Sequence, residues 1–172
     1  YNSMTSRLLV DKIEGKTTAS AVEMPSGSVV QTVFHSFNDE TEIASTSFTD
    51  CTGSSFTFTP KFASSKLIIS FNASFYLYRD NNGQGGTIEL NVDGSRVGDP
   101  VDATGYEHYY SLTASTIINY LIVASKEVQI DASNTNAKTI KLQARAYVTS
   151  NSGKVEVNEA GNHTSTIKVQ EI

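Results

Sequence analysis

The stretch "KLIISFNASFYL", residues 66–77, alternates between apolar and polar side chains and predicts the class of fold. The apolar positions are Leu67, Ile69, Phe71, Ala73, Phe75 and Leu77. The residues between them are mostly polar, with Ile68 and Tyr76 as exceptions. Because successive side chains of a strand point to opposite faces, this period predicts a long strand with one face on a core and the other mostly in water.

Other segments show the same alternation, and each is expected to form strand structure. They are residues 27–37, 54–60, 87–97, 138–148 and 153–172. Asp93-Gly94 is a strong hairpin signal, and the last segment is expected to hold two short strands joined by a turn at 158–162. Together the segments predict an all-β fold, an antiparallel β-sandwich or jelly roll of about eight strands.

The composition supports a folded β protein and argues against two classes of partner. Thr, Val, Ile, Tyr and Phe favour strands, and the abundant Ser, Asn and Gly favour the turns between them. The net charge of −5 disfavours binding to nucleic acid or to anionic lipid. No apolar stretch approaches the roughly 20 residues of a membrane span, and the lone Cys51 cannot form an internal disulfide.

The most apolar stretch is "STIINYLIVA", residues 115–124, and it allows two interpretations. Its apolar residues fit a helical stripe, but they also fit a strand that is apolar on both faces. We favour the strand, and leave residues 114–124 open between the two. A strand with two apolar faces needs a cover for the second face, and a neighbouring subunit would supply one.

The beginning of the chain differs from the rest. Residues 1–24 hold scattered apolar side chains with no steady period, and Pro25 and Gly27 then mark a boundary. We expect residues 1–24 to be the extended end of a fibre shaft or linker, and residues 25–172 to be the β-sandwich domain.

The sequence offers no catalytic or metal-binding set. His35, His108 and His163 are far apart, and none lies in a metal-ligand motif. Residues 80–85, "DNNGQG", weakly resemble a calcium loop, but position 12 is Asn91 and not a bidentate Glu, so an ordinary hairpin loop is expected. We therefore expect a protein that is not an enzyme and that has no cofactor or metal.

One cluster is a candidate for recognition. "GYEHYYSL" gathers Tyr106, His108, Tyr109 and Tyr110 after a loop rich in Pro, Asp and Gly. Tyrosines on a loop offer contact area and a hydroxyl group at low entropic cost, which suits binding of a saccharide or a protein. The alternative is that a strand begins here and its residues alternate between core and surface.

Several motifs, taken in order, resemble the C-terminal head domains of phage tail fibres. They are "MPSGSVVQTV" (24–33), "STSFTDCTGSSFTFTPKFASSKLIISFNASF" (45–75) and "GKVEVNEAGNHTSTIKVQEI" (153–172). The segment "DKIEGKTTASAVEMP" (11–25) is similar to the shaft that precedes such heads.

This resemblance implies a homotrimeric β-sandwich head on a virion, made in the host cytoplasm and joined to an upstream fibre shaft. The implied function is attachment of the particle to a host cell-surface saccharide or protein, without insertion into the membrane. A structural module for trimerisation, capping or decoration is the alternative, and a polymer-degrading enzyme is a third hypothesis.

Overall fold

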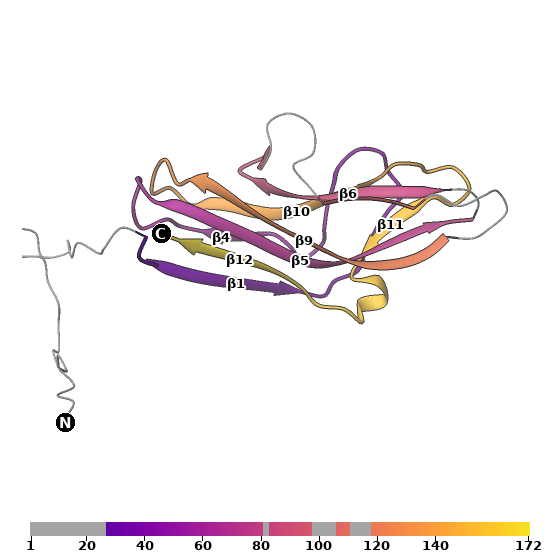
Figure 1. Cartoon of the computed structure of the whole chain (residues 1–172), viewed down its shortest axis with the longest axis horizontal. Helices are drawn as coiled ribbons and strands as arrows, with labels where there is room; N and C mark the ends of the chain where they lie inside the picture. The colour runs from indigo at the N-terminus through magenta and orange to yellow at the C-terminus, as the bar shows by residue number, and fades with distance from the viewer. Residues whose placement is uncertain (1–26, 81–82, 98–105, 111–117) are drawn as a thin grey trace, which may run out of the picture.

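The computed structural model describes residues 27–80, 83–97, 106–110 and 118–172, with 106–110 and 118–119 described as backbone only. Residues 1–24, expected to be the end of a shaft, lie outside the described residues. The described chain forms two antiparallel sheets that face each other (Figure 1).

The first sheet is built around one long strand. Its members are β1 (Gln31–Phe37), β2 (Thr41–Ile43), β5 (Lys66–Arg79), β9 (Ile118–Asp131), β11 (Lys154–Val157) and β12 (Ser165–Glu171). β12 and β11 pair in succession along one edge of β5, and β9 pairs along its whole length. β9 therefore occupies the other edge of β5. β1 and β2 complete the sheet beyond β12 and β11.

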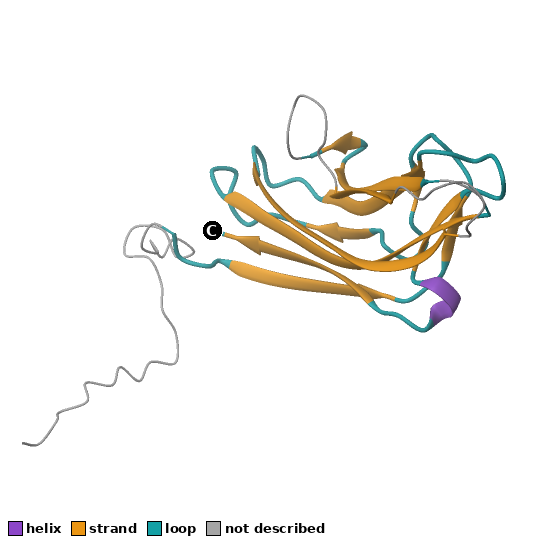
Figure 2. Cartoon of the chain, turned by 45° about the vertical axis from the view of Figure 1, so that its right-hand side comes forward, coloured by secondary structure: helices purple, strands orange, loops and turns teal. Residues whose placement is uncertain are grey.

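The second sheet has the same construction around β10. Its members are β3 (Thr49–Asp50), β4 (Phe56–Phe58), β6 (Gln84–Val92), β7 (Ser95–Arg96), β8 (Tyr106–Tyr110) and β10 (Lys138–Ala146). β3 and β4 pair in succession with β10, and β7 and β8 pair in succession with β6. A short 3-10 helix, η1 (Glu159–Gly161), lies at one end of the sandwich (Figure 2).

Over the described residues, four pairs of strands each lie end to end and together border one neighbouring strand or one neighbouring pair. They are β1 with β2, β3 with β4, β7 with β8, and β11 with β12. Counted as single interrupted strands, they leave each sheet four strands across and the sandwich with eight. The chain passes repeatedly between the sheets, and the last strand inserts between the first and the third. Two four-stranded sheets connected in this way form a jelly roll, which confirms the predicted fold class.

The core lies between the sheets, and the alternating residues of β5 form its centre. Leu67, Ile69 and Phe71 are at most 2% exposed, and Ala73, Phe75 and Leu77 continue the same buried row. The facing sheet contributes alternate residues of β6 and β10, including Leu90 and Leu142. The period of two in residues 66–77 thus identified the inward face of β5 correctly.

Two connections expected to be simple hairpins have other roles. β5 and β6 belong to different sheets, so the segment around residues 80–85 is a crossing and not a hairpin. Gln84 anchors this crossing from a fully buried position: its Nε2 donates to Val148 O at 2.8 Å, and its Oε1 accepts from Gly85 N at 3.0 Å. A polar side chain inside the core replaces the hydrogen bonds that a hairpin ladder would have supplied.

The turn expected at 158–162 is an excursion between two strand segments that run along the same edge of β5. Asn158 begins it with a left-handed backbone conformation (φ 57°). Its buried side chain donates through Nδ2 to Phe37 O at 3.1 Å and accepts through Oδ1 from the Ser165 hydroxyl at 2.6 Å. These bonds hold the break in β11–β12 beside the break between β1 and β2.

Other local predictions have mixed outcomes. Asp93 and Gly94 both have positive φ and connect β6 to β7, so the predicted hairpin is confirmed. Residues 118–124 belong to a strand, and residues 114–117 lie outside the described part. The ring of His35 stacks on that of Phe56 with centroids 4.7 Å apart, and its Nε2 lies 2.7 Å from Gly53 O. It is inward because its pairing partner on β12 is the buried Ile167.

At Gly86, strand β6 packs closely against side chains of the first sheet. A Cβ atom there would lie 2.7 Å from Arg145 O and from a Val155 methyl, and 2.9 Å from the Phe75 ring. We predict that Gly86→Ala lowers the free energy of unfolding by about 1–3 kcal/mol, the usual cost of overpacking. Denaturant unfolding measures this, with the exposed Ser125→Ala as control. Equal stability of both variants would contradict the close approach.

Glu171 is a fully buried carboxylate near one end of the sandwich. It accepts hydrogen bonds from the backbone N–H groups of Lys61 and Phe62 at 2.9 Å and from Gln31 Nε2 at 2.6 Å. Burial by itself raises the pKa of Glu171, but these hydrogen bonds, with one from Ser65, outweigh it and hold the pKa below its ordinary value. The group thus connects the segment after β4 to β12 and β1.

A lowered folded-state pKa means that Glu171 stabilises the fold above its unfolded-state pKa. This contribution is lost as the pH falls through the folded-state pKa. We predict that Tm declines below about pH 4.5, near the ordinary pKa of Glu, and that Glu171→Gln lowers Tm at pH 7 and flattens this decline. Thermal melts from pH 2 to pH 7 check this, and an unchanged slope in the variant would contradict it.

Candidate recognition surfaces

The residues predicted for recognition lie on the edge of the second sheet. Tyr106, His108, Tyr109 and Tyr110 belong to β8, whose backbone pairs with β6 from Ile88↔Tyr106 to Gln84↔Tyr110. They therefore lie in a strand, as the alternative interpretation had it, and not in a loop. Their side chains are outside the described part of the structure, and their role in recognition stays a prediction.

The outer face of the second sheet has an unexpected feature. Every residue of β6 is buried, including the outward-facing Thr87, Glu89 and Asn91. Alternation predicts that such polar residues face water. Here other side chains cover them, and the carboxylate side chain of Glu89 is 0% exposed.

Phe48 and two arginines lie close together on this face. The guanidinium of Arg96 lies 4.6 Å from the centroid of the Phe48 ring, and that of Arg145 lies 4.7 Å from the same centroid. Arg145 also lies 5.7 Å from the centroid of the Tyr147 ring. Arg96 Nε donates to Glu89 Oε2 at 2.7 Å. We call Phe48, Thr87, Glu89, Arg96, Arg145 and Tyr147 the Phe48 cluster.

Sequence reasoning did not find the Phe48 cluster, because its members come from distant segments. Phe48 directly precedes β3, and Arg145 and Tyr147 lie on or just beyond β10. The register brings them together: Thr49 pairs with Ala144, so Phe48 falls beside Arg145. The one signal in the sequence is the row of polar and aromatic side chains at alternate positions of "KLQARAYV". Alternation places this row on the solvent-facing side of the strand.

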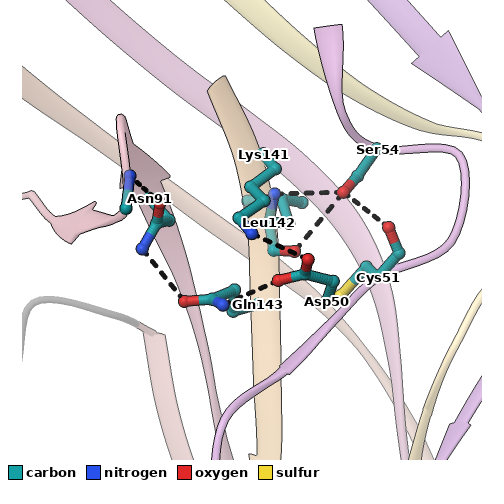
Figure 3. A network of polar contacts seen from close by, with 8 residues as sticks. Asp50, Cys51, Ser54, Asn91, Lys141, Leu142 and Gln143 are labelled. Atoms are coloured by element: carbon teal, nitrogen blue, oxygen red, sulfur yellow. Dashed lines mark hydrogen bonds and ion pairs between the residues drawn. The ribbon is translucent and has the colours of Figure 1, made fainter. Parts of the chain in front are cut away.

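A polar network continues from the Phe48 cluster along the same face (Figure 3). Asp50 accepts from Lys141 Nζ and from Gln143 Nε2, each at 2.7 Å, and Asn91 Nδ2 donates to Gln143 Oε1 at 3.1 Å. The hydrogen bond from Lys141 lowers the pKa of Asp50, and that from Gln143 adds to it, against the opposing effect of desolvation. Asp50 and Lys141 therefore neutralise each other on this face.

Beneath this network the chain makes a second interruption, between β3 and β4. The Ser54 hydroxyl donates to Cys51 O at 2.7 Å and accepts from Leu142 N at 3.1 Å, in place of a ladder bond (Figure 3). Cys51 is buried, and burial, followed by the charge of Asp50, raises the pKa of its thiol. This thiol is a core side chain.

A different surface lies on the outer face of the first sheet, along β9. Leu121 and Val123 are 41% and 65% exposed, and they pair across the sheet with Tyr76 and Ser74 of β5. We call Tyr76, Leu121 and Val123 the β9 apolar face. Three of the six exposed large apolar side chains of the described residues lie in β9, which makes this strand the most apolar exposed element.

Tyrosine and lysine side chains border the β9 apolar face. The rings of Tyr76 and Tyr78 stack with centroids 6.5 Å apart, and Lys154 Nζ lies 5.4 Å from the Tyr78 centroid. Lys154 is paired with Glu42 and Glu156. Tyrosines are enriched at protein–protein interfaces.

Among the described residues there is no group of three or more His, Cys, Asp or Glu side chains placed to hold a metal ion. In the same part of the chain, no helix is long and apolar enough to span a membrane.

Comparison with known proteins gives likenesses among solved structures alone. No protein-family model matches the chain, and no curated protein matches it. Among solved structures, one described as "Structure of infectious bursal disease virus Gx strain" is similar at 15% identity and a TM-score of 0.31. The likeness covers 88% of this chain and 42% of that one, so this chain spans less than half of that protein. A TM-score this low does not establish a shared fold, and the assignment as a jelly roll rests on the strand order of the chain itself.

Proposed function

We propose that the protein is a virion attachment head that assembles as a homotrimer and binds a host cell-surface saccharide or protein. The observation that carries the assembly is the β9 apolar face, because Leu121 and Val123 stand exposed on the face of a long sheet strand. The tail-fibre motifs of the sequence support the viral setting, and jelly rolls occur widely in capsid and lectin domains.

The trimer would place the β9 apolar face against a neighbouring copy. Burial of Leu121 and Val123 would remove exposed aliphatic area from water, and the adjacent tyrosines would add contact area with polar groups. Among the described residues β9 pairs only with β5. Three identical heads on one fibre would then present several weak receptor sites together, which raises avidity without tight single sites.

We predict that the chain has a solution mass three times 18.6 kDa and that Val123→Glu reduces it toward the monomer. A carboxylate buried at position 123 would be desolvated without a partner, which is costly. Light scattering measures the mass. Gln129→Glu is the matched control, since it lies on the same exposed face of the same strand. A wild-type monomer, or a trimer that Val123→Glu leaves intact, would contradict the contact.

Attachment is tested separately from assembly. We predict that the isolated head binds susceptible cells and competes with intact particles, and that Tyr109→Ala with Tyr110→Ala weakens this binding. Flow cytometry with labelled head measures the binding. A trimer that neither binds nor competes would instead be a structural module for trimerisation, capping or decoration, which the β9 apolar face would serve equally well.

The proposal requires no bond-breaking step. Shortening of a surface polysaccharide that disappears when a single acidic residue is changed would favour the depolymerase hypothesis instead.

A further inference from the structure

Arg145 differs from the other cations on the outer face of the second sheet. Arg96 is paired with Glu89, and Lys141 is paired with Asp50. Among the described residues Arg145 has no carboxylate partner. Its nearest polar contact is from Nε to Thr87 Oγ1, at 3.5 Å, which is the outer limit of a hydrogen bond.

Two aromatic rings lie close to the guanidinium of Arg145. Phe48 and Tyr147 lie 4.7 and 5.7 Å away from it, centroid to Cζ, and Tyr147 is in turn held by the Thr87 hydroxyl, which donates to its Oη at 3.2 Å. A guanidinium that stacks on an aromatic ring can still use its N–H edge to bind an acceptor. Less entropy is lost on binding when the donor is already ordered.

The chemistry of this edge selects the ligand. A guanidinium fork matches the two oxygens of a carboxylate, with two parallel N–H···O bonds. The chain as a whole carries a net charge of −5, so a general positive field does not attract anions to this face. Binding of an anion would therefore depend on the local fork of Arg145, with Arg96 as the nearest second guanidinium over the same ring.

The neighbouring groups suit a sugar. The Gln143 amide is already bonded to Asp50 and Asn91, but the rings of Phe48 and Tyr147 beside Arg145 supply apolar surface. Arg145, Gln143 and Tyr147 are all only partly buried, so the site is a surface and can accept one residue of a longer chain.

We propose that the Phe48 cluster binds a carboxylate-bearing saccharide such as a uronic acid residue, with its carboxylate on the N–H edge of Arg145. This inference rests on the proposed function and names the receptor class for it: an acidic polysaccharide of the host surface.

The test is a titration of the full chain with trigalacturonic acid, followed by calorimetry or NMR shifts. We expect saturable binding that Arg145→Gln abolishes and that Arg145→Lys weakens at least tenfold, because Lys keeps the charge but loses the fork. Lys168→Gln removes one positive charge from the other sheet and is the matched control, expected to bind as wild type. Melting curves of each variant establish that it is folded, and Phe48→Leu, which keeps Arg145, is expected to weaken binding as well.

Further experiments distinguish a carboxylate from a phosphate ligand, and distinguish failure of this site from failure of the proposed function. The methyl ester of trigalacturonic acid should not bind, and binding of mannose 6-phosphate in its place would overturn the carboxylate assignment. Equal binding by folded Arg145→Lys and wild type would overturn the role of the fork. Attachment to cells without any binding of the uronide would overturn this site and leave the proposed function standing. Binding of the uronide that depends on Arg145, without attachment to cells, would overturn the proposed function and leave this site standing.

Discussion

The packing of the inward row of β5 against the second sheet is the interaction on which the rest of the structure depends. β5 pairs with β9 on one edge and with β11 and β12 on the other, so its position fixes both halves of the first sheet. A shift of its register by one residue would turn its whole apolar row to the outside. The burial of this row therefore fixes the register of every strand that pairs with it.

The interruptions of the strands are made possible by buried polar side chains. Ser54 and Asn158 each hold a break in a strand, and Gln84 holds the crossing between the sheets. Each is 0% exposed, and each supplies hydrogen bonds where the backbone ladder is lost. The continuity of the sandwich is thus maintained by side chains where the backbone departs from it, at the cost of placing amides and a hydroxyl in the core.

Much of the fold could be predicted from the sequence, because alternation is a local signal. The inward faces of β5, β6 and β10 and the turn at Asp93-Gly94 all follow from it. The crossing after β5 could not be predicted. A short polar segment has the same kind of sequence whether it joins two strands of one sheet or connects one sheet to the other. The Phe48 cluster could not be predicted either, because it depends on the register of β3 against β10. Exposed Leu121 and Val123 were foreseeable from the two-sided apolar pattern of β9.

The position of β12 between β1 and β5 has a consequence for how the molecule is made. β1 is the earliest strand described, and within the described residues it pairs with the latest, β12. During synthesis β1 must wait unpaired until residues 165–171 have left the ribosome, and non-local pairing of this kind slows folding. A chain terminated before β12 would lack the strand that joins β1 to β5, and its first sheet would be incomplete.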